Sequence, residues 1–123
     1  MSSNMASLPD GVELRSGKFY DDRWISSEIQ LAFTNMPETF VFYLTLWNPD
    51  TSAGCHMNTV TVSCNDIIRV TDKIRMGQVV DISVEFAGAS KGVLGIKVKH
   101  SIPGSQLDRR ERAMKVVDVG WKD

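Results

Sequence analysis

The sequence reads Val80-Asp81-Ile82-Ser83-Val84-Glu85-Phe86, and in this stretch apolar and polar side chains alternate at every position. Successive side chains of a β-strand point to opposite faces, so the pattern predicts a strand with one buried face and one solvent-facing face. A helix would instead repeat its apolar residues every three or four positions. The stretch therefore indicates a half-buried strand of an antiparallel sheet.

Other parts of the chain extend this pattern. We expect further strands near residues 28–34, 39–47, 57–64, 67–70, 94–98 and 113–121, separated by turn-forming residues such as Asn65-Asp66 and Met76-Gly77. The charged residues 106–112 lack an apolar stripe and predict a loop or one short turn. Strands at a spacing of roughly ten residues predict an all-β fold, an antiparallel two-sheet β-sandwich of about seven to nine strands, jelly-roll-like or immunoglobulin-like.

The chain has 123 residues, which is the size of one domain. Residues 1–11 are small and polar and end in Pro9-Asp10-Gly11, so we expect a flexible N-terminal arm there. No repeat or long linker follows. We therefore expect residues 12–123 to form a single β-sandwich domain.

Charge and hydropathy exclude several classes of partner. Lys and Arg number 14 against 15 Asp and Glu, a net charge of −1 that gives no electrostatic pull toward nucleic acid. The apolar runs are too short for membrane insertion. The N-terminus lacks the basic and apolar regions of a secretory signal, so we expect a cytoplasmic protein.

Few residues are suited to catalysis or metal binding. The two histidines are His56 and His100, and the neighbour of His56, Cys55, would point to the opposite face of a strand. Cys55, His56 and Cys64 do not have the spacing of a closed zinc site, although a Cys55–Cys64 disulfide is geometrically possible. We expect no catalytic residue, no metal and no cofactor, and hence not an enzyme.

Aromatic residues break the alternation between 39 and 47. Tyr43 and Trp47 lie on the face that should be polar, together with Val41. One interpretation is a central strand whose second face is covered by a loop. The other is an exposed aromatic platform, which would bind a sugar ring or a protein partner.

Charged residues surround a second tryptophan. Asp21, Asp22, Arg23 and Trp24 follow one another, and the two carboxylates could accept hydrogen bonds from sugar hydroxyls, hold a calcium ion or simply form a turn. Trp24 could stack on a sugar or plug one end of the sandwich. The later run 108–112 could be a solvated loop, could place an Arg on Asp21, Asp22 or Asp108, or could recognise an anionic ligand.

Motifs at the two ends give a family resemblance. Residues 16–26 (Ser-Gly-Lys-Phe-Tyr-Asp-Asp-Arg-Trp-Ile-Ser) resemble an opening motif Gly–aromatic–acidic–x–Trp–x–Ser/Thr. Residues 101–111 (Ser-Ile-Pro-Gly-Ser-Gln-Leu-Asp-Arg-Arg-Glu) resemble a closing motif Pro–x–x–x–x–Asp–x–Arg. Together they are similar to the small β-sandwich domains appended to bacterial glycosyltransferases and to envelope-polysaccharide or sugar-modifying enzymes. The resemblance spans about residues 12–121.

The resemblance implies a sandwich with an accessory or carbohydrate-binding role, in which Asp22, Trp24, Asp108 and Arg110 carry the motif positions and act as a structural clasp or as a binding site. We expect a non-catalytic module associated with bacterial surface-glycan synthesis that binds a glycan weakly, with a catalytic protein or a second copy as further possible partners. The ligand-binding residues would be Tyr20, Asp21, Asp22, Trp24, Trp47, Arg109 and Arg110. The alternative is a protein-interaction or oligomerisation module without glycan binding.

Overall fold

The computed structural model describes residues 8–48, 57–88, 90–102, 106 and 109–123, none of which lies in a helix. The described strands are β1 (Val12–Ser16), β2 (Trp24–Ile25), β3 (Glu28–Phe33), β4 (Thr39–Trp47), β5 (Met57–Cys64), β6 (Ile67–Arg75), β7 (Val79–Ala87), β8 (Gly92–Val98) and β9 (Met114–Lys122). Seven of them match the predicted strands. The sequence did not indicate β1 and β2, which are short, and it predicted β6 too short.

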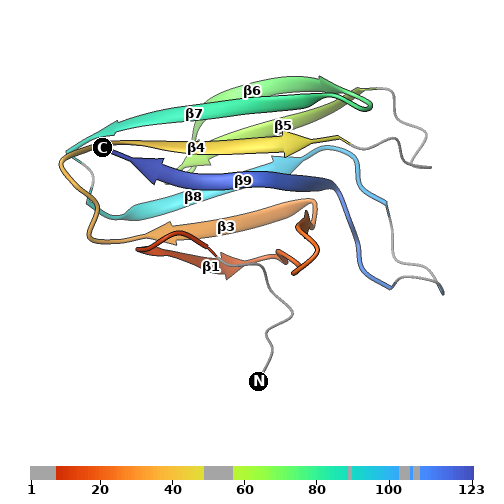
Figure 1. Ribbon diagram of the computed structural model, residues 1–123, viewed down its shortest axis with the longest axis horizontal. Coiled ribbons are helices and arrows are strands. Elements are labelled where there is room, and N and C mark those ends of the chain that lie inside the picture. The colour runs from red at the N-terminus through yellow and green to blue at the C-terminus, as the bar shows by residue number, and fades with distance from the viewer. Residues whose placement is uncertain (1–7, 49–56, 89, 103–105, 107–108) are drawn as a thin grey trace.

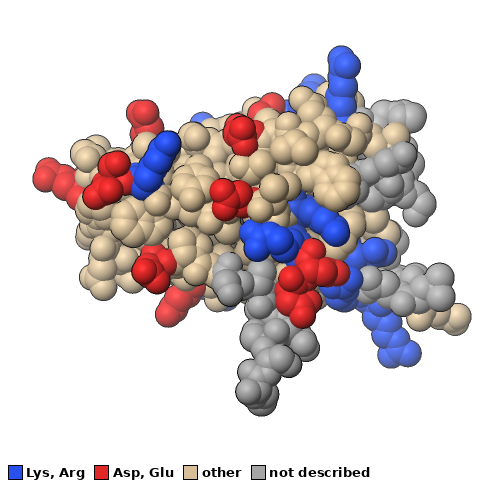
Figure 2. Space-filling view, in the orientation of Figure 1, with Lys and Arg blue, Asp and Glu red and all other residues tan. Residues whose placement is uncertain are grey.

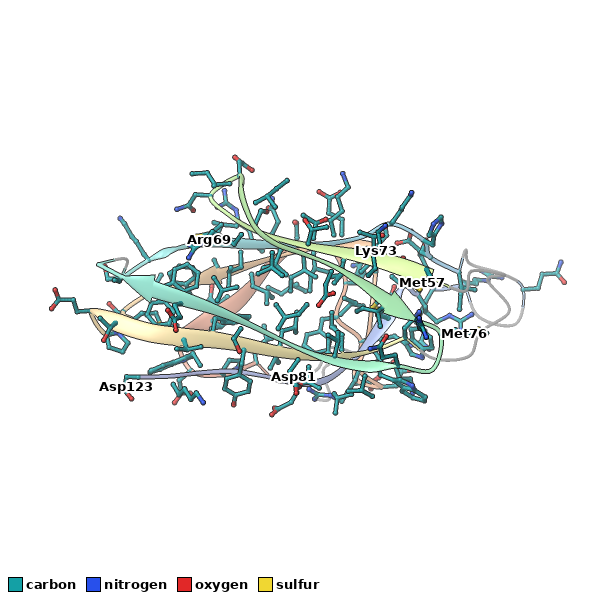
Figure 3. The ribbon with its side chains drawn as sticks, turned by 90° about the horizontal axis from the view of Figure 1, so that it is seen from above. Met57, Arg69, Lys73, Met76, Asp81 and Asp123 are labelled. Atoms are coloured by element: carbon teal, nitrogen blue, oxygen red, sulfur yellow. The ribbon has the colours of Figure 1, made fainter. Side chains whose placement is uncertain are left out.

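The strands form two antiparallel sheets that face each other (Figure 1). One sheet has the order β1-β3-β8-β5-β6 and the other the order β2-β9-β4-β7. Figure 3 shows the two layers from above, with the neighbouring edge strands β6 and β7 carrying Lys73 and Asp81. The predicted all-β sandwich is confirmed.

The pairing of the strands identifies a jelly roll. β5 pairs with β6, β4 with β7, β3 with β8 and β2 with β9, always antiparallel. The chain from β2 to β9 is thus one long hairpin whose two arms are wound together across both sheets. This arrangement is a jelly roll and not an immunoglobulin fold, so it decides between the two predicted architectures.

A two-residue turn forms the tip of this long hairpin. Asn65 and Asp66 both have positive φ, 48° and 69°, as a type I′ turn requires, and this turn matches the twist of the strands that it joins. The Asn65 side chain also accepts a hydrogen bond of 3.0 Å from the backbone N–H of Val93. The tip is therefore fastened to β8 of the same sheet.

The core lies between the sheets and contains the apolar face that the alternation predicted. Every inward residue of β3, β4 and β5 is buried. At one end Phe33, Phe40 and Phe86 form an aromatic cluster with centroids 4.9 to 5.5 Å apart. Leu8 packs against this core from outside the strands, and residues 1–7 of the expected arm lie outside the described residues.

Gly17 is required where the chain leaves β1. It has φ +82°, and a Cβ there would lie against the carbonyl oxygen of Glu28 and within 2.8 Å of Ile29 Cα. Gly77 has the same conformation, φ +83°, but a Cβ there would meet nothing within 4 Å. Comparing the two glycines therefore separates the energetic cost of backbone strain from that of steric overlap.

We predict that Gly17→Ala destabilises the protein more than Gly77→Ala does. Both changes place a Cβ on backbone with positive φ, which costs about 1–2 kcal/mol. Only Gly17→Ala also makes the new Cβ overlap with backbone atoms, which cannot move out of its way as a side chain could. Chemical denaturation of both variants measures the difference in unfolding free energy. Equal losses would contradict the packing of Gly17 against β3.

Candidate functional site

A tight turn precedes β2 and carries the two adjacent aspartates. The backbone N–H of Arg23 donates to the Tyr20 carbonyl at 2.9 Å, and that of Tyr20 donates to the Trp24 carbonyl at 2.8 Å. Arg23 has a positive φ of 75°, and its Nε donates to the Val116 carbonyl of β9 at 2.6 Å. The turn is thereby held against the last strand, with Asp21 and Asp22 exposed at its tip.

An arginine from the closing motif forms hydrogen bonds to this turn. Both terminal nitrogens of Arg110 donate to the two carboxylate oxygens of Asp22, each at 2.8 Å. The guanidinium also lies 4.7 Å from the centroid of the Tyr20 ring. These hydrogen bonds from Arg110 hold the pKa of the Asp22 carboxyl below its ordinary value. The two ends of the domain are thus joined by one forked ion pair.

A row of alternating aromatic and cationic side chains crosses the four-stranded sheet. Trp24 of β2 pairs with Lys115 of β9, which pairs with Trp47 of β4, so all three lie side by side on the outer face. The ammonium of Lys115 is 5.6 Å from the Trp24 ring and 5.9 Å from the Trp47 ring. We call these three residues the tryptophan row.

The two tryptophans of this row differ in exposure. Trp24 is 8% exposed, and the Arg112 guanidinium lies a further 5.5 Å from its ring centroid. Trp47 is 36% exposed and therefore offers more ring area to a ligand. The Trp24 ring is instead buried beside the Arg112 and Lys115 side chains, so in this structure it makes packing contacts and offers little area to a ligand.

Polar groups follow Trp47 along the same face. Thr45, two residues earlier on β4, donates a 2.6 Å hydrogen bond to Asp81 of β7 and pairs with Asp118 of β9. The ring of Tyr43 lies over Gly120, because a glycine there leaves room for it, and this contact makes Tyr43 half-buried. Figure 2 shows carboxylates spread over this face and charges of both signs gathered at one end.

The structure therefore brings together some predicted residues and not others. Tyr20, Asp22 and Arg110 meet in one cluster, and Trp24 meets Trp47 through Lys115. Asp21 and Arg109 are exposed beside that cluster, and Asp108 lies outside the described residues. Lys115 was not predicted, because its position opposite Trp24 depends on the pairing of distant strands.

A second polar cluster was also missed. The carboxylate of Glu111 accepts hydrogen bonds from the Ser27 backbone N–H at 3.0 Å, the Ser27 hydroxyl at 3.2 Å and the Ser101 hydroxyl at 2.8 Å. The backbone donor contributes most to a lowered pKa of this carboxyl, and the two hydroxyls add to it. Glu111 thus ties the start of β3 to the segment after β8.

Metal-binding clusters are absent from the described part of the chain, which contains no group of three or more His, Cys, Asp or Glu placed to hold an ion. Cys55 and His56, considered as ligands from the sequence, lie outside it. Cys64 is a buried free thiol whose pKa is raised by burial. Among the same residues, no helix is long and apolar enough to cross a membrane.

Comparison with known proteins finds similarity only among solved structures, and it is distant. No family model and no curated protein matches the chain. Among solved structures, it is similar to a family 35 carbohydrate-binding module from an environmental isolate, with 16% sequence identity and a TM-score of 0.41 over 98% of this chain and 88% of that chain. A likeness this distant transfers no ligand and no residue role to this protein.

We predict that the two tryptophans of the row respond differently to removal. Trp24→Ala should lower the unfolding free energy by about 3–5 kcal/mol, because it leaves a cavity beside β9. Trp47→Ala should lower it by only about 1 kcal/mol, because the ring is partly in solvent. Thermal or chemical denaturation compares them. A stable Trp24→Ala protein would contradict the packing role of this indole.

We also predict an acid-sensitive contribution from Glu111. Folding lowers the pKa of this carboxyl, so its stabilisation is complete above the ordinary pKa of glutamate and is lost as the pH falls below about 4. Glu111→Gln should cost about 1–3 kcal/mol at neutral pH and flatten the pH dependence of stability. The exposed Asp118→Asn variant is the control, and an unchanged pH profile in Glu111→Gln would refute the prediction.

Proposed function

We propose that the chain is a non-catalytic carbohydrate-binding module whose central contact is Trp47. The observation that carries the proposal is an indole, 36% exposed, on the outer face of the sheet with hydroxyl and carboxylate groups in the next row. The C–H face of a pyranose packs on such a ring, while its hydroxyls donate to nearby carboxylates. Asp81 and Asp118 supply those acceptors two residues along the strands, at a spacing of about 7 Å.

Cationic groups extend the proposed site toward the turn that carries the Asp22–Arg110 ion pair. A glycan lying across the strands from Trp47 would pass Lys115 and Trp24 and reach the turn that carries Asp21 and Asp22. There Arg109 and Arg110 add donors for hydroxyls or an acidic substituent. Because Arg110 already donates two hydrogen bonds to Asp22, we propose that the main role of this pair is to hold the turn in place.

The expected affinity is low. The face is shallow and buries little of a ligand, so a single short glycan should bind with a Kd on the order of 10 μM to 1 mM. The end motifs, which resemble those of domains appended to surface-glycan enzymes, favour an accessory role beside bacterial surface-glycan synthesis in the cytoplasm.

The test is a glycan array probed with the wild-type protein, with Trp47→Ala and with Val117→Ala. Val117 is an exposed apolar residue of β9 outside the tryptophan row, and its removal controls for general loss of apolar surface. We expect a consistent set of glycans that is retained by Val117→Ala and lost by Trp47→Ala. Hits that survive Trp47→Ala would move the site away from this indole.

A second candidate function rests on a separate observation. Trp47 pairs with Val79 of β7, which is 54% exposed, so two apolar side chains lie together on an open face. Such a patch would also suit a second copy of the chain or a catalytic partner protein. Light scattering distinguishes this function: a dimer that Val79→Asp dissociates, together with a blank array, would favour the interaction module.

A further inference from the structure

The outer face of the five-stranded sheet is hollowed along its middle strand, β8. Three adjacent depressions of about 430, 290 and 360 Å³ follow this strand from end to end. Lys97, Gly95 and Val93 line them in turn, and these residues are outward-facing neighbours two positions apart. Successive outward rows of a strand are about 7 Å apart, so the three depressions lie one after another along β8, and we call them together the β8 trough.

A glycine, Gly95, lies in the middle of the trough and leaves its floor without a side chain. Glycine destabilises the interior of a strand. Gly95 nevertheless lies in β8, which pairs with β3 on one side and with β5 on the other. Gly95 does not have a positive φ, and a Cβ there would meet only the rotatable hydroxyl of Ser63, at 2.8 Å. The fold therefore does not require glycine at this position. A missing side chain in the middle of a sheet face is typical of close approach by a ligand or another backbone.

The side chains around the trough suit a hydroxylated ligand. Thr59, Thr61 and Ser63 of β5 flank it on one side and Gln30 of β3 on the other. Ser27 and Ser101 both donate their hydroxyl hydrogens to Glu111, so their remaining lone pairs can accept hydrogen bonds from a ligand.

The end of the trough near Lys99 is also rigidly held. The backbone N–H of Lys99 donates to the Thr59 carbonyl at 2.9 Å. Buried Asn58 accepts from the His100 backbone at 3.0 Å and donates to its carbonyl at 2.9 Å. These bonds fix the chain after β8 against β5, so the lysines at this end start from an ordered backbone.

Charge selects the class of ligand. The trough is lined by the cations Arg15, Lys91, Lys97 and Lys99 and by the carboxylates Glu28 and Asp66. Lys97 is the cross-strand neighbour of Glu28, but among the described residues neither Lys97 nor Lys99 is within ion-pair distance of a carboxylate. The four cations outnumber the two carboxylates, so this strip of hydroxyl and amide groups is positive on balance and complements an extended chain of sugars that carries negative groups.

We propose that the β8 trough binds an acidic oligosaccharide, with carboxylate, sulfate or phosphate groups held by Lys97 and Lys99 and sugar rings lying over Gly95. The trough is on the opposite face from Trp47, so the proposal is independent of the site proposed there. Nucleic acid fits less well, because the residues that line the trough include no exposed aromatic ring on which bases could stack.

Gly95→Val provides the sharpest test. Valine suits a strand, so the variant should fold at least as stably as the wild type while its side chain fills the floor of the trough. We expect it to lose binding to a galacturonic acid hexamer measured by calorimetry. The double variant Lys97→Ala/Lys99→Ala should raise the Kd at least about tenfold, and added salt should weaken wild-type binding.

Controls separate the possible outcomes. Lys122→Ala removes a cation from the opposite face, and Trp47→Ala removes the other proposed site, so both should bind the acidic hexamer normally. A heparin-derived hexasaccharide and inorganic phosphate distinguish sulfated and phosphorylated sources from carboxylates. Binding unaffected by Gly95→Val, equal binding of a neutral xylose hexamer, stronger binding of an oligothymidylate, or no binding of any acidic glycan at millimolar concentration would overturn the proposal.

Discussion

The structure depends on the nested antiparallel pairing of the chain about the Asn65-Asp66 turn. Once β5 pairs with β6, each earlier strand meets a later one, until β2 reaches β9. This pairing brings together residues almost a hundred positions apart. The Asp22–Arg110 ion pair and the tryptophan row are consequences of it, since neither could form unless the outermost strands had closed the roll.

The sequence predicted those parts of the fold that depend on local alternation. The long strands satisfy it because one of their faces is buried against the other sheet. β2 has two residues and is held by its partner β9, so no local pattern could reveal it. β6 extends beyond Val70 to Arg75, because its ladder to β5 continues although most of its side chains are exposed on the sheet edge.

The last strand shows a further limit of alternation. In β9 the register against β4 shifts between Thr45 and Leu46, so Val117 is an extra residue and bulges outward. Val116 and Val119 consequently both face the core side, and Trp121 can reach Phe40 at 6.3 Å. A strict period of two would have placed Trp121 outside. The bulge becomes visible only when the partner strand is known.

The candidate site was predictable in its residue types but not in its arrangement. The end motifs indicated that Asp22 and an arginine matter, and the aromatic surplus in β4 singled out Trp47. Which tryptophan is exposed depends on tertiary packing: the same row buries Trp24 at the sheet edge and leaves Trp47 open. Gly95 gave no signal, because in an alternating sequence it simply occupies an outward position.

The centre of each proposed ligand surface lies on strands, and only its ends, such as Lys99 or the turn with Asp22, lie outside them. The side chains of the tryptophan row and of the β8 trough start from paired backbone, so a ligand would not have to order a disordered segment on binding. Affinity on such faces is limited by how little of the ligand they bury. An extended glycan relieves that limit, because each added sugar makes contact with another row of the same rigid sheet. Both proposals therefore predict that long glycans bind more tightly than single sugars.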